Sequence, residues 1–320
     1  LALRATAGRG RVVGAAWIVI HVASQLFFLS SLSARDQVAF YRSPPPLADH
    51  LPEGARLVHG NRGNLFGPDT FEPADLPDQR LLWLQRQNHM ELAPNVGPLW
   101  GFRYDYNLSP EGLDSFMTRS VAEAMPRLPD EARLRLLAGA GVDYLLLDRR
   151  LDPGLESLAE LTASEETLGG RMWVYRIRGS RPPARAVGRV ESSPHLSATL
   201  ATVAAPEFDP RSTVVLPGQG PVLAGEAGVA RRVGVSSESV TVEVESSAAT
   251  VLVLDRAWLP IYEATVDDAP AAVEVADMDR VAIRVPAGSH RVRLWADRGP
   301  LIVSTAVSLA TALGLSLIHI

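Results

Sequence analysis

The residues most suggestive of chemistry are two aspartates one position apart, in Asp277-Met278-Asp279. This spacing matches the Asp-x-Asp motif of metal-dependent sugar-nucleotide transferases, in which two carboxylates hold a metal ion against diphosphate oxygens. The motif lies between two apolar segments, residues 273–275 and 281–285, that are expected to be strands. So short a motif is common by chance. The motif is also expected outside the cytoplasm, where an enzyme would not meet sugar nucleotides. We therefore interpret it as a solvated turn and predict no metal site.

A polar-aromatic cluster in a loop-rich stretch is the second candidate site. Aromatic faces beside carboxylate and amide groups suit the recognition of sugars. Loops also carry such residues simply to cover a core, and the sequence leaves both interpretations open. The candidate sugar-binding residues are Trp100, Tyr104, Asp105, Tyr106 and Asn107, with Asn95 close by.

Missing residue types exclude several kinds of chemistry. The chain has 320 residues, no cysteine, and only arginine among its 31 basic residues. Thiol nucleophiles, disulfides, thiolate metal sites and a P-loop lysine are therefore absent. The seven histidines never pair at the spacing of a helical zinc site, and a net charge of −5 gives no basic surface for nucleic acid. We name no catalytic residue, no cofactor and no metal.

Helix and buried-strand signals alternate between residues 35 and 180, which predicts a small mixed α/β domain. One helix is expected from Ser109 to about Met125. A second is expected from Glu131 to Ala138, capped by Asp130 and ended by the glycines that follow. Strands are expected over residues 56–59, 142–147 and 172–177.

Beyond Arg181-Pro182-Pro183 the helix signals disappear and short strands follow one another. Val240, Val242 and Val244 alternate with polar residues, as in a half-buried strand. Many short strands separated by Pro, Gly and Asp predict an antiparallel β-sandwich over residues 181–298. Further strands are expected over residues 251–254, 281–285 and 291–294.

Two segments without charged side chains flank these domains. Residues 12–34 would span about 35 Å as a helix, against a hydrocarbon core of about 30 Å. Residues 299–320 are similar, and both are predicted to be transmembrane helices. A cleavable signal peptide is the alternative for the first segment. The last six residues, 315–320, also match the translation of a common sequencing adapter, so we expect different codons there in the genome.

Arginines before the first apolar segment favour a cytoplasmic N-terminal side, over residues 1–11. The residues between the two segments would then be extracytoplasmic. The predicted fold is therefore membrane-anchored α/β plus all-β. Two transmembrane helices would flank a mixed α/β domain at residues 35–180 and an antiparallel β-sandwich at residues 181–298.

The most specific sequence features lie near the C-terminus. Residues 258–268 read WLPIYEATVDD, and residues 285–290 read VPAGSH. Together they resemble the C-terminal extracytoplasmic end of the YfhO-type bacterial membrane proteins. Those proteins usually show aromatic-Pro-Gly-Trp, then Val-Asp-Gly, then Val-Pro-Ala-Gly-x-His. Here Ile261 and Tyr262 replace the Gly-Trp, and Asp268 replaces the last Gly of Val-Asp-Gly.

Looser similarity to that family covers residues 141–144, 174–176 and 208–211. The residues of segments 258–268 and 285–290 also have purely structural interpretations. Gly288 is expected to supply a positive φ in a turn, and Asp267-Asp268 a hairpin turn. Trp258 and Tyr262 are interpreted as core or rim aromatics rather than as a sugar platform.

The resemblance implies a GT-C-like glycosyltransferase that uses polyprenyl-phosphate sugars at the bacterial cell membrane. The expected partners are membrane lipids, a polyprenyl-phosphate sugar and an envelope glycopolymer acceptor. In that fold the catalytic carboxylates lie on early loops, so we expect them upstream of this chain and expect the chain alone to be inactive. The alternative is a non-catalytic envelope binding or scaffold protein with a membrane-anchored sandwich domain.

Overall fold

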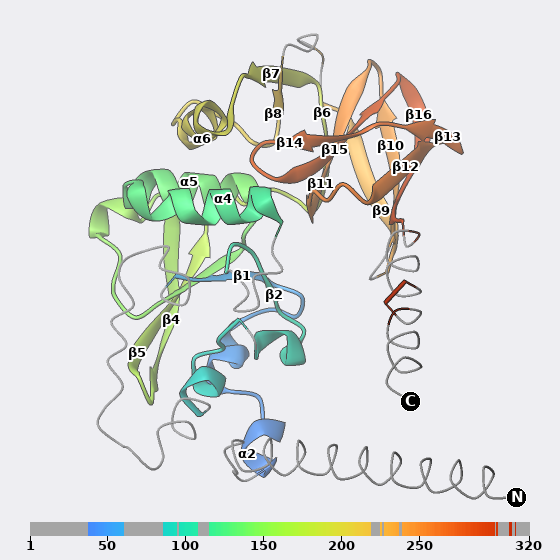
Figure 1. The fold of residues 1–320 in the computed structure, drawn as a ribbon. Coiled ribbons are helices and arrows are strands. Elements are labelled where there is room, and N and C mark those ends of the chain that lie inside the picture. Colours follow the sequence, from blue (N-terminus) through green and yellow to red (C-terminus); the bar gives the residue numbers. More distant parts are fainter. Residues whose placement is uncertain are drawn as a thin grey trace, which may run out of the picture.

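A computed structural model describes residues 38–60, 86–94, 96–107, 115–218, 225, 227–236, 239–297, 299, 307–308 and 311. Within these residues, 16 strands form four sheets, accompanied by a few short helices (Figure 1). The helices are α2 (Val38–Arg42), η1 (Pro46–His50), η2 (Gly97–Trp100), α4 (Phe116–Ala124), η3 (Met125–Arg127), α5 (Asp130–Ala140), η4 (Pro153–Leu155) and α6 (Leu196–Ala204).

The prediction of two flanking transmembrane helices is wrong for the chain as described. It is mostly β-sheet, and none of its described helices is long and apolar enough to cross a membrane. The longest of them, α5, has 11 residues, which is about 17 Å, because a helix rises only 1.5 Å per residue. Residues 1–34 and 312–320 lie outside the described residues, as does most of 299–311. The described apolar residues instead fill cores between the sheets and between the N-terminal sheet and the helices and loops that cover it.

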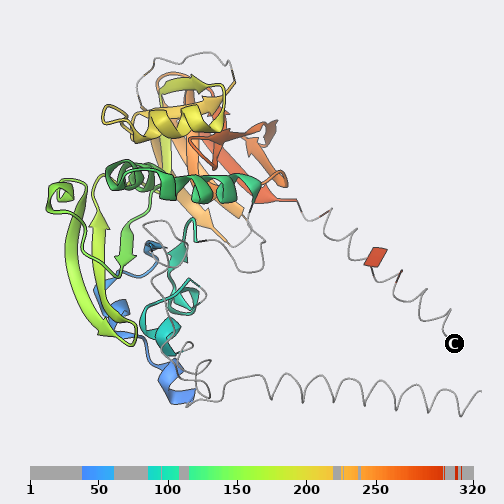
Figure 2. The ribbon, with the colours of Figure 1, turned by 60° about the vertical axis from the view of Figure 1, so that its left-hand side comes forward.

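The N-terminal sheet has the strand order β2-β1-β3-β5-β4. Strand β1 pairs in parallel with β2 and β3, whereas β5 pairs antiparallel with β3 and β4. Figure 2 shows β4 and β5 as a long curved hairpin at one side of this sheet. The bounds are β1 (Arg56–His59), β2 (Arg103–Tyr104), β3 (Tyr144–Leu147), β4 (Ala159–Thr167) and β5 (Gly170–Ile177).

Apolar cores cover both faces of the N-terminal sheet, which is why its middle strand β3 reads Tyr-Leu-Leu-Leu without alternation. On one face, Leu145 and Leu147 pack against residues of α4 and α5. On the other face, Leu57 and Leu146 pack against the segments around η1 and η2. Helix α5 ends at Gly141, whose φ of +79° forms the left-handed cap that the sequence predicts. The predicted start of the preceding helix lies outside the described residues, and the described helix α4 is capped by Ser115.

The second half of the chain contains two antiparallel sheets packed face to face. The outer sheet has the order β13-β12-β16-β10-β9, and the inner sheet β14-β15-β11-β6. The valines predicted to face inward along β10 are buried between them. The bounds are β6 (Ala184–Val187), β9 (Val229–Val235), β10 (Ser239–Ser246), β11 (Thr250–Ala257), β12 (Tyr262–Val266), β13 (Ala269–Ala271), β14 (Val273–Ala276), β15 (Arg280–Val285) and β16 (Gly288–Ala296).

A third layer covers the free face of the inner sheet. It consists of the parallel pair β7 (Arg189–Ser193) and β8 (Thr213–Pro217), joined through helix α6. The prediction that helices are absent beyond residue 181 was therefore wrong. The stretch 196–204 carries no charged residue, and α6 packs its Leu200 and Val203 against the core that contains α5. His195, an unusual N-cap, accepts the backbone N–H of Ala198 at its ring Nδ1.

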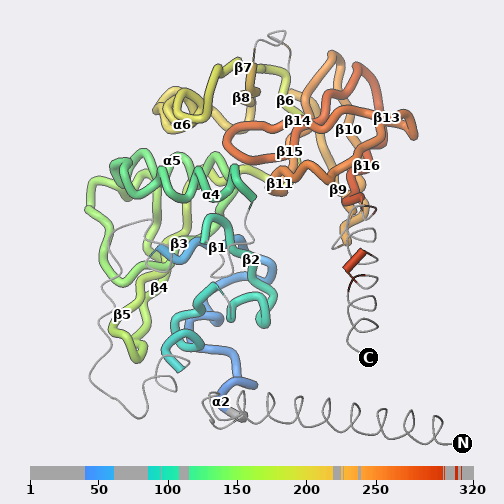
Figure 3. The backbone as a smooth tube through the Cα atoms, in the orientation of Figure 1, coloured from blue at the N-terminus to red at the C-terminus, as the bar shows by residue number. Residues whose placement is uncertain are grey.

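The turn between β14 and β15 joins the two halves of the molecule. Figures 1 and 3 show α4 and α5 lying between the N-terminal sheet and this hairpin. Met278, at the tip of the turn, is fully buried and belongs to the same apolar core as Leu134 and Leu137 of α5. The core of the N-terminal half is therefore completed by a side chain from the sandwich.

Candidate functional site

Buried arginine–aspartate pairs surround the turn between β14 and β15. Arg280 Nη2 donates to Asp105 Oδ1 at 3.0 Å, and Arg56 Nη2 donates to Asp105 Oδ2 at 2.7 Å. The hydroxyl of Tyr106 donates to Asp279 Oδ1 at 2.9 Å. We call the following residues the interface network: Arg56, Asp105, Tyr106, Arg181, Arg185, Asp277, Asp279 and Arg280.

Asp277 holds two arginines with one oxygen. Its Oδ2 accepts from Arg181 at 2.9 Å and from Arg185 at 2.7 Å. Its Oδ1 accepts from the backbone N–H of Val215 at 3.1 Å. The motif Asp277-Met278-Asp279 does form the turn between two strands that the sequence predicts, but the turn is not solvated. Its two aspartates are 3% and 0% exposed, because the turn is pressed against α4 and α5.

Opposite charges keep Asp105 and Arg280 ionised. Burial alone would raise the pKa of Asp105, but the charges and hydrogen bonds of Arg280 and Arg56 outweigh burial, and the pKa is lowered. Burial alone would lower the pKa of Arg280, but Asp279, Tyr106 and Asp105 outweigh it, and the pKa is raised well above its ordinary value. Burial, assisted by the neighbouring charge of Arg185, lowers the pKa of Arg181 to about 9. Asp105 therefore acts as a counter-ion to arginine at neutral pH.

The structure brings the candidate sugar-binding residues together around β2, but it also engages most of their polar atoms. Asp105 and Tyr106 belong to the interface network, and Asn107 bonds the backbone of His59 through both its amide atoms. The hydroxyl of Tyr104 donates to the carbonyl of Leu92. Trp100 keeps a buried indole N–H without a hydrogen-bond partner among the described residues. Asn95 lies outside those residues. Sugar binding at this cluster stays a prediction.

Sequence reasoning missed the arginines of the interface network, because single arginines carry no recognisable spacing. One local signal was Gly141, where φ is +79°. A Cβ atom there would lie 2.7 Å from Arg56 Nη1 and 3.3 Å from the backbone oxygen of Arg181, so only glycine fits. Its neighbour Asp143, within the looser family match, accepts from the backbone N–H of Arg56 and from the hydroxyl of Ser180. These residues therefore have structural roles.

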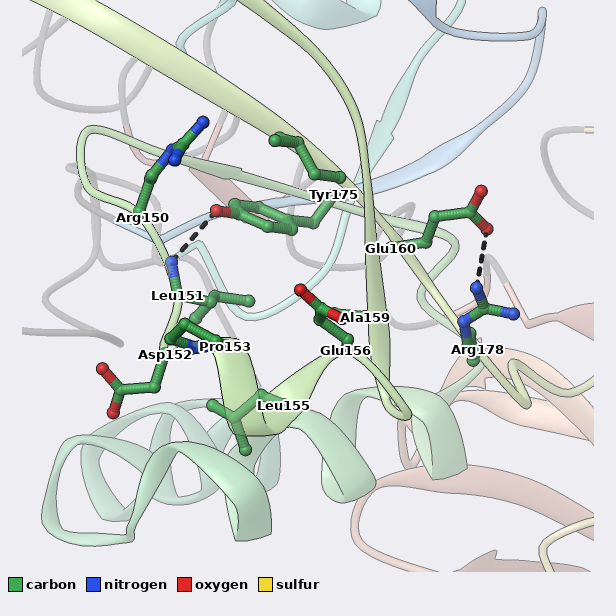
Figure 4. Close-up of a pocket in the computed structure, with 11 residues that line it drawn as sticks. Arg150, Leu151, Asp152, Pro153, Leu155, Glu156, Ala159, Glu160, Tyr175 and Arg178 are labelled. Carbon is green, nitrogen blue, oxygen red and sulfur yellow. Dashed lines mark hydrogen bonds and ion pairs between the residues drawn. The ribbon is translucent and has the colours of Figure 1, made fainter.

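A polar pocket of about 410 Å³ lies beside the base of the β4–β5 hairpin (Figure 4). The hydroxyl of Tyr175 accepts from the backbone N–H of Leu151 at 3.0 Å, and Glu160 pairs with Arg178 at 3.3 Å. The pocket mixes both signs of charge, so its electrostatics favour no particular charge on a ligand. Its lining residues are Arg150, Leu151, Asp152, Pro153, Leu155, Glu156, Ala159, Glu160, Leu161, Tyr175 and Arg178.

Residues of the segments 258–268 and 285–290 meet at one turn of the sandwich. Asp267 and Asp268 have φ values of +49° and +67° and join β12 to β13, which confirms the predicted two-residue hairpin. Gly288 has a φ of +124°, which confirms the predicted positive-φ glycine. His290 Nδ1 lies 2.6 Å from Asp267 Oδ2, so residues from both family-like segments form one ion pair. These motifs therefore have a local structural explanation.

We predict that His290 titrates above its ordinary pKa of 6.5, because Asp267 and the carbonyl of Ala287 accept hydrogen bonds from its protonated ring. A raised pKa in the folded state stabilises the fold below pH 6.5, and this contribution is lost as the pH rises through the raised value. The measurement is an NMR titration of the imidazole signals, with His290→Gln identifying the signal. Asp267→Asn should move the midpoint back toward 6.5; an unchanged midpoint would contradict the assigned cause.

No family model matches the chain, and comparisons with curated proteins and with solved structures also found no match. Within the described residues, no group of three or more His, Asp or Glu side chains is arranged to hold a metal ion.

Proposed function

We propose that this chain is a rigid, non-catalytic binding unit of a bacterial envelope protein. It would hold an envelope glycopolymer outside the cytoplasm for glycosyl-transfer machinery of the YfhO type. The observation that carries the proposal is the buried turn at residues 277–280, where Asp279 bonds Tyr106 of the N-terminal half and Asp277 holds Arg181 and Arg185. These carboxylates serve the packing of the two halves of the chain.

The electrostatics of the network support a non-catalytic role. A general base works best when its pKa lies near the working pH and when it can reach the proton that it removes. The pKa of Asp105 is instead lowered by two arginines, and Asp277 and Asp279 are buried against their partners. Asp105 is therefore a weak base.

Rigidity supports a binding role. A surface whose parts are already fixed loses less conformational freedom when it binds a ligand. The interface network and Met278 fix the sandwich against α4 and α5, so surface sites on either half keep constant positions. The resemblance of residues 258–268 and 285–290 to the YfhO-type proteins suggests an association with glycosyltransferase machinery. The catalytic carboxylates of that family are expected in other loops, which is consistent with a non-catalytic role for this chain.

The test uses the whole purified chain and cell-wall sacculi that carry their attached glycopolymers. We expect the chain to sediment with intact sacculi and to remain soluble with sacculi stripped of those polymers by acid. In a parallel assay with a polyprenyl-phosphate sugar and the same acceptor, we expect no transfer. Failure to sediment with any sacculi would overturn the binding role. Transfer that disappears in Asp277→Asn would overturn the non-catalytic role.

A further inference from the structure

An arginine-lined pocket of about 530 Å³ lies at one end of the sandwich, where the sandwich meets the N-terminal half. Its volume is within the usual range for small-ligand sites. Arg103 lines it from β2, and Arg256 lines it from the end of β11. Among the described residues, the lining contains these two arginines and no carboxylate.

We propose that this pocket binds an anionic group of an envelope glycopolymer, either a phosphodiester or the carboxylate of an acidic sugar. The inference rests on the proposed function for the source of the ligand, and it specifies the charge of the polymer and the place where it binds. The anion would lie between the guanidinium groups of Arg103 and Arg256. Both halves of the chain would then hold the same ligand.

The first argument is that both guanidinium groups reach the same pocket. Arg256 Nη2 donates to the backbone oxygen of Ser236 at 2.7 Å, and Ser236 itself lines the pocket. The side chain of Arg103 is 54% exposed, and its Nη1 lies 3.5 Å from Oδ2 of Asp255, the residue that precedes Arg256. One ligand in this space can therefore contact both arginines.

The apolar part of the lining faces the same space. Val235 lies opposite Val240 in the register of β9 and β10, and Val240 is buried between the two sheets. Residues opposite one another in a sheet share a face, so Val235 lies on the inner face of its sheet. Tyr262 packs against the same core and also lines the pocket. The pocket is therefore the open end of the space between the sheets.

The second argument is an excess of positive charge behind the pocket. Three Nη1 atoms surround Oδ2 of the buried Asp255, those of Arg103 at 3.5 Å, Arg232 at 3.6 Å and Arg56 at 4.0 Å. This oxygen has no hydrogen-bond partner among the described residues. Asp105 is the closer partner of Arg56, at 2.7 Å. Asp255 is thus shared between arginines, and the positive potential that remains attracts an anion.

The chemistry of arginine and the shape of the site select the ligand class. A guanidinium fork matches the oxygens of a phosphate or a carboxylate and forms charge-assisted hydrogen bonds with either. An anionic membrane surface is usually recognised by clusters of four to eight basic residues. Here the described lining offers two arginines in a concave site. This arrangement suits one or two charged groups of a polymer better than a lipid surface.

The test is isothermal titration calorimetry of the whole chain with poly(glycerol phosphate), polygalacturonate, neutral dextran and vesicles of phosphatidylglycerol. We expect saturable binding of at least one of the two anionic polymers, weakened by added salt, and no binding of dextran. Arg103→Gln and Arg256→Gln should each weaken the binding about tenfold, the effect of losing one charge-assisted hydrogen bond. The polymer that binds more tightly identifies the anionic group.

Arg231→Gln is the matched control. It removes the same charge from β9, but the side chain is 75% exposed, pairs with Glu243 and lies outside the described lining. It should leave the affinity unchanged. Arg103 is the decisive position if Arg256→Gln fails to fold, because its exposed side chain can be changed without opening a core. Circular dichroism checks the fold of each variant.

Several results would overturn the inference. Equal losses in Arg103→Gln and Arg231→Gln would show attraction to the whole surface and not to the pocket. Binding of dextran as tight as that of the anionic polymers, or binding of the vesicles in place of both polymers, would also overturn it. If the chain sediments with sacculi while neither anionic polymer binds, the inference fails and the proposed binding role stands. If the polymers bind through Arg103 but the chain does not sediment with sacculi, the proposed role fails and the anion site stands.

Discussion

Replacing Arg280 with methionine is expected to lower the free energy of unfolding by about 3–5 kcal/mol, the usual cost of breaking a buried ion pair from one side. Arg280 is 1% exposed, and its loss leaves Asp105 and Asp279 with one cationic partner fewer. The methionine side chain fills much of the space of the arginine. The loss of unfolding free energy therefore comes mainly from the missing charge and not from a cavity. Guanidinium denaturation followed by circular dichroism measures the effect.

Arg284→Met is the matched control, because Arg284 lies on the same strand and also pairs with a carboxylate, Glu274, at 2.7 Å. That pair is partly exposed, and we expect a cost of about 1 kcal/mol or less. Adding Asp105→Asn and Asp279→Asn to Arg280→Met should recover part of the lost stability, since the uncompensated charges are then gone. Equal losses in Arg280→Met and Arg284→Met would contradict the interface network as described.

Truncating Met278 to alanine is expected to cost about 2–5 kcal/mol, the range for removing a buried methionine side chain from a core. Met278 belongs to the sandwich by sequence, but its side chain fills the core under α4 and α5. The loss should therefore destabilise both halves together, and one cooperative transition should move to lower denaturant. Tryptophan fluorescence and far-ultraviolet circular dichroism would follow it.

Val229→Ala on the edge strand β9 serves as the control for Met278→Ala. Its side chain is 69% exposed, and surface truncations of this kind usually change stability by no more than about 0.5 kcal/mol. If Met278→Ala costs no more than Val229→Ala, Met278 does not fill the core in solution. If the variant unfolds in two separate steps, Met278 is the main contact between the halves.

Local features of the fold could be predicted from the sequence. Strand β1 matches its expected residues, and β5 and β10 include theirs, because alternation and β-branched residues report on a single strand. The Asp267-Asp268 hairpin and Gly288 were predictable since turn geometry restricts residue type at the turn itself. The sequence was also sufficient to place the end of α5 near Gly141.

Features that depend on distant partners could not be predicted. Two aspartates on either side of one methionine predict a solvated turn. Only the packing against α5 shows why Met278 is buried. Asp105 suggested sugar recognition because its arginine partners lie 49 and 175 positions away in the chain. Helix α6 was missed because its N-cap, His195, is not a residue that usually marks a helix start.

The position of Met278 has a consequence for how the protein is made. Ribosomes release a chain from its N-terminus onward at about 5–20 residues per second. Residues of α4 and α5 emerge well before the β14–β15 hairpin that completes their core. During that interval the apolar surface around Leu134 and Leu137 has no sandwich to cover it. Nascent chains halted before residue 278 should therefore bind chaperones and be cleaved by proteases at α4 and α5, and this sensitivity should end once the hairpin has left the ribosome.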